Sequence, residues 1–477
     1  MKKPCMNLVG GEWISSQELI RNFNPARVKE LVSTHARGTP EDIDRAVNTA
    51  RVAFQSWRYS TPSERAVLLD KIGTSLFERR QEIGRLLTRE QGKTLAEAVG
   101  EATRAAEVFH FYAQEAFRLA GEVVPSTRPG VSVEVTREPL GVVGLITPWN
   151  FPIAIPAWKT APALAFGNTV VLKAAELTPA SAHLMAEIIQ DAGCPAGVFN
   201  FVCGSGSVVG HALVEHVEVD AISFTGSVST GENIASTAMK HMKKIQLEMG
   251  GKNPMIVMSD ADLDKAIQVC LNGAFFATGQ RCTASSRLIV EEGIHDEFVE
   301  KLIEETQCLR VGDPLHKETQ IGPVVSEDQL NNNLYYVDLA TREGAETVGG
   351  DRIDSLPTGY YQRPAIFVNA TNEMRISREE IFGPCASVIK VADFDEAINV
   401  ANDTEFGLSA GICTTSLKRA REFKRRSEAG LAMVNLPTAG VDHHVPFGGR
   451  KKSSYGQREK GRYAVEFYTD IKTAYTA

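Results

Sequence analysis

The cysteine best placed for chemistry is Cys282, which lies in the run Gly-Gln-Arg-Cys-Thr-Ala-Ser at 279–285. A thiol becomes a strong nucleophile when a nearby cation or helix N-terminus favours its thiolate form. Arg281 supplies such a cation, and the small residues around the thiol leave room for a substrate. A cysteine taken alone is also compatible with an inert, buried side chain. The apolar or helical surroundings of Cys194, Cys203 and Cys270 fit that alternative better, so Cys282 is the candidate nucleophile.

A candidate general base, Glu248, lies between Leu247 and Met249 and precedes the pair Gly-Gly at 250–251. Apolar neighbours desolvate a carboxylate and raise its pKa, which suits an acid to proton abstraction near neutral pH. In isolation the residue is better read as a helix-terminal glutamate paired with Lys244 or Lys252.

An amide donor is offered by Asn150 in Pro-Trp-Asn-Phe-Pro at 148–152. Two prolines and two aromatic residues stiffen this backbone, so the amide can be a preorganised donor to a developing oxyanion. An ordinary turn residue is the alternative.

Two glycine patterns compete for a dinucleotide. Gly-Ser-Gly-Ser-Val-Val-Gly at 204–210 has three residues, not two, between its last glycines, so we interpret it as a strand-to-helix turn. Phe-Thr-Gly-Ser at 224–227 also follows a strand and can open a helix onto a phosphate. Lys173 and Glu176 end another strand, where an ammonium and a carboxylate suit ribose hydroxyls.

Composition limits the classes of function. The 477 residues suggest two or three domains, and the 51 basic and 59 acidic side chains give a net charge of −8, which disfavours nucleic acid and anionic membranes as partners. The apolar region 139–165 contains Asn150, Lys159 and several prolines, so it is not expected to span a membrane. The apolar residues near the start are interrupted by Gly-Gly at 10–11, which argues against a secretory signal. Eight cysteines without a Cys-x-x-Cys pair indicate free thiols, so we expect a cytoplasmic protein.

Hydrophobic patterning predicts the elements that position these residues. Thr39 and Pro40 begin a helix, and helical patterns continue over 62–119. Apolar strands at 141–147, 169–173, 199–203 and 221–225 alternate with helices at 180–192 and 207–216, which is typical of a parallel sheet wound on both faces. A second α/β lobe begins near residue 250, with strands at 254–258, 287–291, 365–369 and 386–391. The alternating tail 467–475 needs a partner strand, for which 131–135 is the candidate.

The order of the motifs identifies a family. Pro-Trp-Asn-Phe-Pro at 148–152, Lys-x-x-Glu at 173–176, Phe-Thr-Gly-Ser at 224–227 and Glu-x-Gly-Gly-Lys at 248–252 are followed by Gly-Gln-Arg-Cys at 279–282, Glu-Ile-Phe-Gly-Pro at 380–384 and Pro-Phe-Gly-Gly at 446–449. Together they resemble the aldehyde dehydrogenase superfamily over essentially the whole chain. The resemblance implies an α/β fold with a Rossmann-type cofactor domain (1–119 and 139–249), an α/β catalytic domain (250–460) and a small β oligomerisation element (120–138 and 461–477). It also implies a homo-oligomer, either a dimer or a tetramer.

The resemblance assigns roles residue by residue. It makes Cys282 the nucleophile, Glu248 the general base and Asn150 the oxyanion donor, and places Lys159 on a proton path. On the cofactor side it implies a ligand set made of Trp149, Lys173, Glu176, Thr225, Gly226, Ser227, Glu380 and Phe382. The reaction it implies is oxidation of an aldehyde to a carboxylic acid through a cysteine thiohemiacetal and a thioester. Glu176 favours NAD over NADP because a carboxylate repels a 2′-phosphate, although NADP use stays open.

Substrate choice rests on finer similarity. The segments 434–449 and 453–456, with Pro-Trp-Asn-Phe-Pro-Ile-Ala-Ile-Pro-Ala-Trp-Lys at 148–159, are similar to the α-ketoglutaric semialdehyde (2,5-dioxovalerate) dehydrogenases. Succinic semialdehyde dehydrogenases usually carry an arginine where this chain has Trp158, so that substrate, or another small aldehyde, is the alternative. Phe151, Trp158 and Phe447 are the expected substrate contacts. Arg281 either binds a distal carboxylate or forms a structural ion pair.

Two other classes of protein, and a metal site, are alternatives to this interpretation. A thiol esterase would have no use for Glu380 and Phe382, the residues implied to lie on the nicotinamide side. A catalytically silent cofactor-binding protein would have no physical need for the cysteine, the glutamate and the asparagine together. His443 and His444 have no third ligand placed near them, so we expect pocket-rim residues and no metal site.

Overall fold

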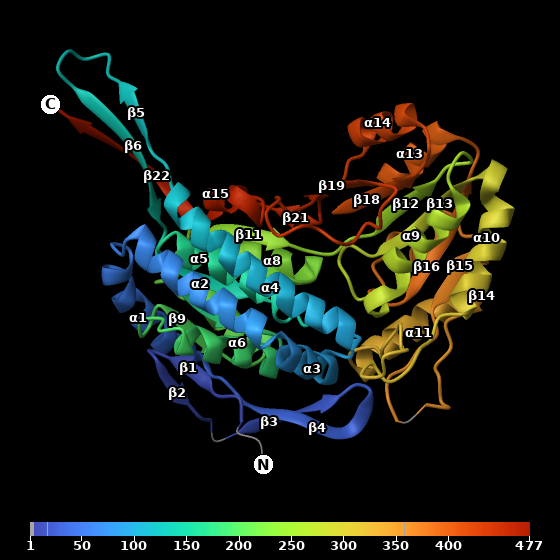
Figure 1. The fold of residues 1–477 in the computed structure, drawn as a ribbon, viewed down its shortest axis with the longest axis horizontal. Coiled ribbons are helices and arrows are strands. Elements are labelled where there is room, and N and C mark those ends of the chain that lie inside the picture. Colours follow the sequence, from blue (N-terminus) through green and yellow to red (C-terminus); the bar gives the residue numbers. More distant parts are fainter. Residues whose placement is uncertain (1–3, 17, 357) are drawn as a thin grey trace.

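The computed structural model describes residues 4–16, 18–356 and 358–477 and shows two α/β lobes with a thin β arm (Figure 1). Residues 1–3, part of the start considered for a secretory signal, lie outside the described residues. None of the helices within the described ranges is long and apolar enough to cross a membrane.

The first lobe is built on an eight-stranded sheet whose five central strands are parallel, in the order β9-β8-β7-β10-β11. These strands are β7 (Val142–Ile146), β8 (Thr169–Lys173), β9 (Phe199–Val202), β10 (Ala221–Thr225) and β11 (Lys244–Glu248). Antiparallel strands complete both edges: β1 (Asn7–Val9) and β2 (Glu12–Ile14) beside β9, and β21 (Ser454–Tyr455) beside β11. The strand order reverses at β7, which is where doubly wound sheets bind ligands.

Helices cover both faces of this sheet because its strands are apolar on both sides. On β7, Val143 and Leu145 join one core cluster, whereas Val142 and Ile146 join the other. The first face carries α2 (Pro62–Glu78), α3 (Arg80–Gln91), α4 (Leu95–Glu115), α5 (Ala154–Ala165) and α6 (Pro179–Asp191), and the second carries α1 (Pro40–Trp57), α7 (His211–Glu215) and α8 (Val228–Lys240). Thr39 caps α1 as predicted, with a hydroxyl that accepts from the backbone N–H of Asp42 at 3.3 Å.

The second lobe has a seven-stranded sheet in the order β14-β15-β16-β13-β12-β18-β19, parallel except for β14. Its strands are β12 (Asn253–Val257), β13 (Ser285–Glu291), β14 (Glu346–Gly349), β15 (Ala365–Val368), β16 (Cys385–Val391), β18 (Ser409–Cys413) and β19 (Leu431–Val434). Its main helices are α9 (Leu263–Phe275), α10 (Glu292–Gln307), α11 (Glu327–Arg342), α13 (Phe394–Asn402) and α14 (Leu417–Arg426). The strands predicted from sequence are therefore confirmed in type and approximate position.

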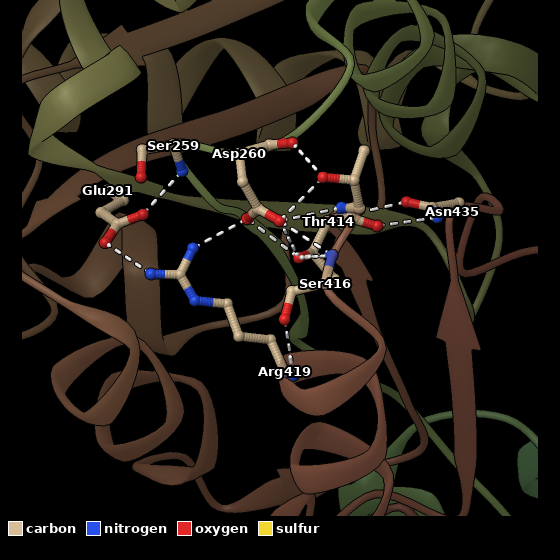
Figure 2. Close-up of polar contacts among 8 residues, drawn as sticks. Ser259, Asp260, Glu291, Thr414, Ser416, Arg419 and Asn435 are labelled. Atoms are coloured by element: carbon tan, nitrogen blue, oxygen red, sulfur yellow. Dashed lines mark hydrogen bonds and ion pairs between the residues drawn. The ribbon is translucent and has the colours of Figure 1, made fainter.

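A polar cluster joins two strands of the second lobe beyond their carboxyl ends (Figure 2). Asp260, after β12, accepts hydrogen bonds from the hydroxyl of Thr414 and the backbone N–H of Ser416, both after β18. Arg419, on α14, donates to the same carboxylate at 2.7 Å. The cluster thus ties α14 to the ends of β12 and β18.

The arm consists of β5 (Glu122–Pro125), β6 (Ser132–Pro139) and β22 (Thr469–Thr476), and it projects from the first lobe (Figure 1). The tail strand pairs antiparallel with the predicted partner, with Thr473 opposite Val135 and Tyr475 opposite Val133. A second hairpin, β3 (Leu19–Asn24) and β4 (Arg27–Ala36), reaches the other lobe, where Tyr361 donates a hydrogen bond to the carbonyl of Ala26.

Three details differ from the sequence predictions. Residues 461–468, assigned to the bridging strands, form η4 (Gly461–Ala464) and α15 (Val465–Tyr468), because Ala464, Phe467 and Tyr468 fall at helical spacing and pack into the first lobe. Strand β21, within the segment 250–460 assigned to the catalytic domain, belongs to the first sheet, where it completes the edge of β11. The predicted helix 207–216 begins as the π-helix η2 (Gly206–Gly210).

Candidate active site

The two lobes present opposite strand ends to each other. Asn150 follows β7, Lys173 ends β8, Thr225 ends β10 and Glu248 ends β11, so the first lobe offers the carboxyl ends of its strands. In the second lobe Cys282 and Glu380 precede β13 and β16, so this lobe offers amino ends. The chain crosses from one sheet to the other between β11 and β12, directly after Glu248.

The loop before Cys282 is tightly held. The short η3 turn (Phe276–Gly279) contains Ala277 and Thr278 at φ values of 53° and 58°, a conformation rare for residues with a Cβ. Its backbone is fixed by the Ala277 N–H, which donates to Glu97 at 2.7 Å. At Gly279 a Cβ would lie 2.1 Å from the carbonyl oxygen of Gly383, so only glycine fits. The loop therefore fixes where the thiol points.

Cys282 is partly exposed, whereas Cys203, Cys270 and Cys413 are buried. Burial of the thiol group, with the carboxylates of Glu380 and Glu248 nearby, raises the pKa of Cys282 to about 12. The prediction that Arg281 favours the thiolate is wrong for this structure, because its guanidinium turns to Glu97 and Asn272. The thiol at rest is therefore protonated and needs a base.

Glu248 is 2% exposed, and the hydroxyl of Ser454 donates to its carboxylate at 2.5 Å. Burial, followed by the charge of Glu459, raises the pKa of Glu248 well above its ordinary value, as the sequence predicted. The alternative pairing with lysines is wrong: Lys244 donates to Thr469 and Asp470, and Lys252 has a buried ammonium without a hydrogen-bond partner among the described residues.

Asn150 is bound to the cysteine loop. Its amide Nδ2 donates to the carbonyl of Gln280 at 3.1 Å, two residues before the thiol, and the side chain is 3% exposed. Its backbone carbonyl accepts from the buried ammonium of Lys93 at 2.7 Å. Lys93 is ion-paired with Glu101, which also accepts from the backbone N–H groups of residues 153 and 154. The turn at 148–152, which the sequence predicts to be rigid, is thus held in place by the buried ion pair of Lys93 and Glu101.

Lys159 is fully buried and ion-paired with Glu459, and its ammonium also donates to Ser223 at 2.7 Å. Neither partner is hydrogen-bonded to Glu248, although the charges of both act on its pKa. Lys159, Glu459 and Ser223 therefore form a buried polar group near the candidate base, Glu248.

A cavity of about 520 Å³ lies between the lobes and is lined by both Cys282 and Glu248. The four expected substrate contacts also line it, namely Phe151, Trp158, Arg281 and Phe447. Trp158 and Phe447 touch, with ring centroids 5.6 Å apart. Thr225 reaches the same cavity from the end of β10. The structure thus brings two of the four catalytic candidates, Cys282 and Glu248, to one space with the substrate candidates, whereas Asn150 and Lys159 do not line this cavity.

The predicted cofactor residues form two groups. Lys173 and Glu176 follow β8, and Thr225, Gly226 and Ser227 lead from β10 into α8, whose first turn Ser227 caps. Burial lowers the pKa of Lys173, and the buried hydroxyl of Thr225 has no hydrogen-bond partner among the described residues. These groups fit a dinucleotide: a buried ammonium, an unpartnered hydroxyl and the N-terminus of a helix all lie along the sheet edge where the strand order reverses.

The second group surrounds Glu380. Its carboxylate accepts from the N–H of Gly251 at 2.8 Å, and a Cβ at Gly250 would lie 2.1 Å from it, which explains the glycine pair after Glu248. Burial raises the pKa of Glu380 to about 7. Beside it Phe382 adopts φ 60° and meets Trp149 edge-on, with centroids 5.3 Å apart.

Sequence reasoning missed the residues that hold the site rather than do chemistry. These are Lys93, Glu97, Glu101, Ser454 and Glu459. Only Glu97 carried a local signal, because Thr-Leu-Ala-Glu at 94–97 has capping-box spacing, and the structure confirms that box. The others act across long sequence separations.

Fold and site together define a class of enzyme. One lobe has a parallel sheet whose strand order reverses at an edge suited to a dinucleotide, and the cleft between the lobes holds a cysteine. The family model described as "Aldehyde dehydrogenase family" matches residues 13–474. The chain belongs to the aldehyde dehydrogenase family and is an oxidoreductase.

Individual relatives cover nearly the whole chain. It is 46% identical to the alpha-ketoglutaric semialdehyde dehydrogenase of Bacillus subtilis over 98% of this chain and 97% of that protein. It is 42% identical to the alpha-ketoglutarate semialdehyde dehydrogenase of Haloferax volcanii over 100% and 99%. Among solved structures, the betaine aldehyde dehydrogenase of Staphylococcus aureus in complex with NAD+ is similar with a TM-score of 0.97 and 35% identity, over 100% of this chain and 95% of that one.

Proposed function

We propose that this enzyme oxidises α-ketoglutaric semialdehyde to α-ketoglutarate, with NAD+ as the favoured oxidant. The observation that carries the chemistry is the shared cavity, because a thiol, a carboxylate of raised pKa and an apolar wall line one space. The names of the Bacillus and Haloferax relatives support the substrate. The alternative substrate is succinic semialdehyde or another small aldehyde, and a substrate panel distinguishes these possibilities.

The reaction begins at the thiol. The thiol of Cys282 gives up its proton to water, and the sulfur adds as a thiolate to the aldehyde carbon. The oxygen of the resulting thiohemiacetal carries negative charge, and the proposed donor to it is the amide of Asn150. Bound nicotinamide supplies the acceptor for the hydride that this carbon loses.

Loss of that hydride leaves a thioester on Cys282. Glu248 then takes a proton from water, the water oxygen adds to the thioester carbon, and the sulfur leaves as the acid forms. The net change adds a hydroxyl group from water to the aldehyde carbon, removes one hydride from that carbon and releases one proton. The Lys159–Glu459 pair behind Glu248 is a candidate route for the released proton.

For the cofactor, Lys173 and Glu176 are the proposed ligands of the adenosine ribose, and Ser227 with the N-terminus of α8 the ligand of the pyrophosphate. Thr225 and Gly226 would line the nicotinamide pocket, with Glu380, Phe382 and Trp149 on the nicotinamide-ribose side. The carboxylate of Glu176 favours NAD over NADP.

The test is a panel of α-ketoglutaric, succinic and simple aliphatic aldehydes, assayed with NAD+ and with NADP+. The proposal requires the highest kcat/KM for α-ketoglutaric semialdehyde with NAD+. Equal kcat/KM values for carboxylated and plain aldehydes would contradict the substrate.

We further propose a cytoplasmic homo-oligomer, a dimer or tetramer, assembled through the β arm. Three large hydrophobic side chains on the arm are exposed in the single chain, namely Val123 (81%), Ile471 (64%) and Tyr475 (60%). Exposing apolar side chains to water is unfavourable, so this surface favours burial against a partner subunit. Sedimentation of the wild type against a variant with Val123→Asp and Ile471→Asp tests the arm, since the double variant should dissociate.

A further inference from the structure

One face of α4 forms a wall of the cavity. Glu97, Gly100, Arg104 and Glu107 all line it, at spacings of three, four and three residues that place them on a single stripe of the helix. Arg104 extends back along this stripe toward the helix N-terminus, since a Cβ at Gly100 would lie 3.4 Å from its Nη1. Because Gly100 has no side chain, the guanidinium of Arg104 can lie over this position of the helix.

Arg104 differs from the other cationic side chains that line the cavity, Lys93 and Arg281, in having no counter-ion among the described residues. Lys93 is paired with Glu101, Glu107 with His443 at 3.4 Å, and Glu97 with Arg281. Among the described residues, the guanidinium of Arg104 forms neither an ion pair nor a hydrogen bond. It also repels its neighbours, because its charge contributes to lowering the pKa of Lys93, Arg281 and Lys460.

Arg281, the arginine that the sequence suggested for substrate binding, is less available. Its side chain is 13% exposed, and its two terminal nitrogens lie 3.5 Å from Glu97 and 3.5 Å from Asn272. The carboxylate of Glu97 in turn accepts from the backbone of the cysteine loop. Arg281 thus braces the loop against α4, whereas Arg104 is exposed and unpartnered.

We propose that Arg104 binds the distal carboxylate of the aldehyde substrate and so sets the preference of the enzyme for dicarboxylic semialdehydes; this inference rests on the proposed function. A guanidinium donates two parallel hydrogen bonds to a carboxylate, or to one carboxylate oxygen and an adjacent 2-oxo oxygen. Binding the charged end at Arg104 leaves the aldehyde end free to reach Cys282 across the same cavity.

The test compares Arg104→Met with the matched control Arg85→Met. Arg85 is also exposed on a helix, α3, but does not line the cavity. With saturating NAD+, Arg104→Met should lower kcat/KM for α-ketoglutaric semialdehyde about 10- to 100-fold, mainly through KM, because charged hydrogen bonds are lost. Its kcat/KM for hexanal should stay within about twofold of wild type or rise, since an aliphatic chain gains nothing from a cation. Arg104→Lys should recover part of the loss.

A binding measurement separates this inference from the proposed function. α-Ketoglutarate should inhibit the wild type competitively against hexanal, and the Ki should rise at least tenfold in Arg104→Met but not in Arg85→Met. An unchanged Ki and an unchanged KM for the semialdehyde in Arg104→Met would overturn the role of Arg104 even if the wild type prefers that substrate. A wild type without any preference for carboxylated aldehydes would instead overturn both proposals.

Discussion

The backbone carbonyl of Asn150 accepts a hydrogen bond from the ammonium of Lys93, a residue 57 positions earlier in the chain. The same ammonium is 4.0 Å from the ring centroid of Phe151 and pairs with the carboxylate of Glu101. The orientation of the candidate oxyanion donor thus depends on a buried charge pair between α4 and the segment before it.

Removing one member of this pair should cost both stability and activity. We expect Glu101→Gln to lower the free energy of unfolding by about 3–5 kcal/mol, because the buried charge of Lys93 loses its partner. It should also lower kcat, since the single amide oxygen of glutamine cannot both accept from the N–H groups at 153 and 154 and hold the ammonium of Lys93, so the turn carrying Asn150 loses one of these contacts. Urea unfolding and steady-state kinetics measure the two effects. The control is Glu82→Gln, which breaks the solvated pair with Arg79 and should cost less than about 1 kcal/mol.

Glu248→Gln should separate the two halves of the reaction. The amide cannot take a proton from water, so thioester hydrolysis should slow by about 10²- to 10⁴-fold. Rapid mixing with aldehyde and NAD+ should show a burst of NADH close to one equivalent per active site, followed by a slow steady rate, and the acylated protein should be seen by mass spectrometry. Equal initial and steady rates without acyl-enzyme would contradict the assigned base.

Much of the fold was predictable because both sheets are built from short apolar strands with sharp turn signals. The strands over 169–173 and 221–225 were placed to the residue, and each is fully or nearly fully buried. The prediction failed at 461–468, where apolar residues beside an alternating tail were assigned to a strand. Their tertiary contacts with the first lobe decide for a helix, and no local pattern reports such contacts.

In the site, sequence reasoning found the residues with reactive side chains but not those that hold them. Cys282, Glu248 and Asn150 lie in stiff, glycine- or proline-bearing loops, which are visible in a sequence. Ser454 is 206 residues from Glu248, so their hydrogen bond follows only from the pairing of β21 with β11. Arg104 was missed for a related reason: its spacing on α4 is ordinary for a helix, and only the cavity shows what that face borders.

Ser454→Ala should shift the pH dependence of the reaction. The hydroxyl of Ser454 donates to the Glu248 carboxylate and so stabilises its charged form, which lowers the pKa of Glu248 against the effect of burial. Without that bond the pKa rises further, and less of the base is ionised at any given pH. The acidic limb of the pH profile of kcat, measured where thioester hydrolysis limits the rate, should therefore move to higher pH. A shift to lower pH would contradict the sign, and an unchanged limb would mean that another group controls it.

Asp260 should make the second lobe sensitive to acid. The network in Figure 2, with donors from Thr414, Ser416 and Arg419, lowers the pKa of Asp260 to about 2 despite partial burial. A carboxyl group whose pKa is lower in the folded than in the unfolded state contributes stability above its unfolded pKa and loses it as the pH falls through the folded one. Because solvent screens this partly exposed carboxylate, the contribution should be about 1 kcal/mol at neutral pH, lost between about pH 5 and pH 2. Asp260→Asn should therefore lower the free energy of unfolding at pH 7 by at least that amount and flatten its dependence on pH below 5.

Asp264→Asn, which removes an exposed partner of Lys301, is the control and should change neither the free energy of unfolding at pH 7 nor its dependence on pH. If Asp260→Asn and the wild type lose stability in parallel down to pH 3, the cluster does not hold the ends of β12 and β18 as the geometry implies.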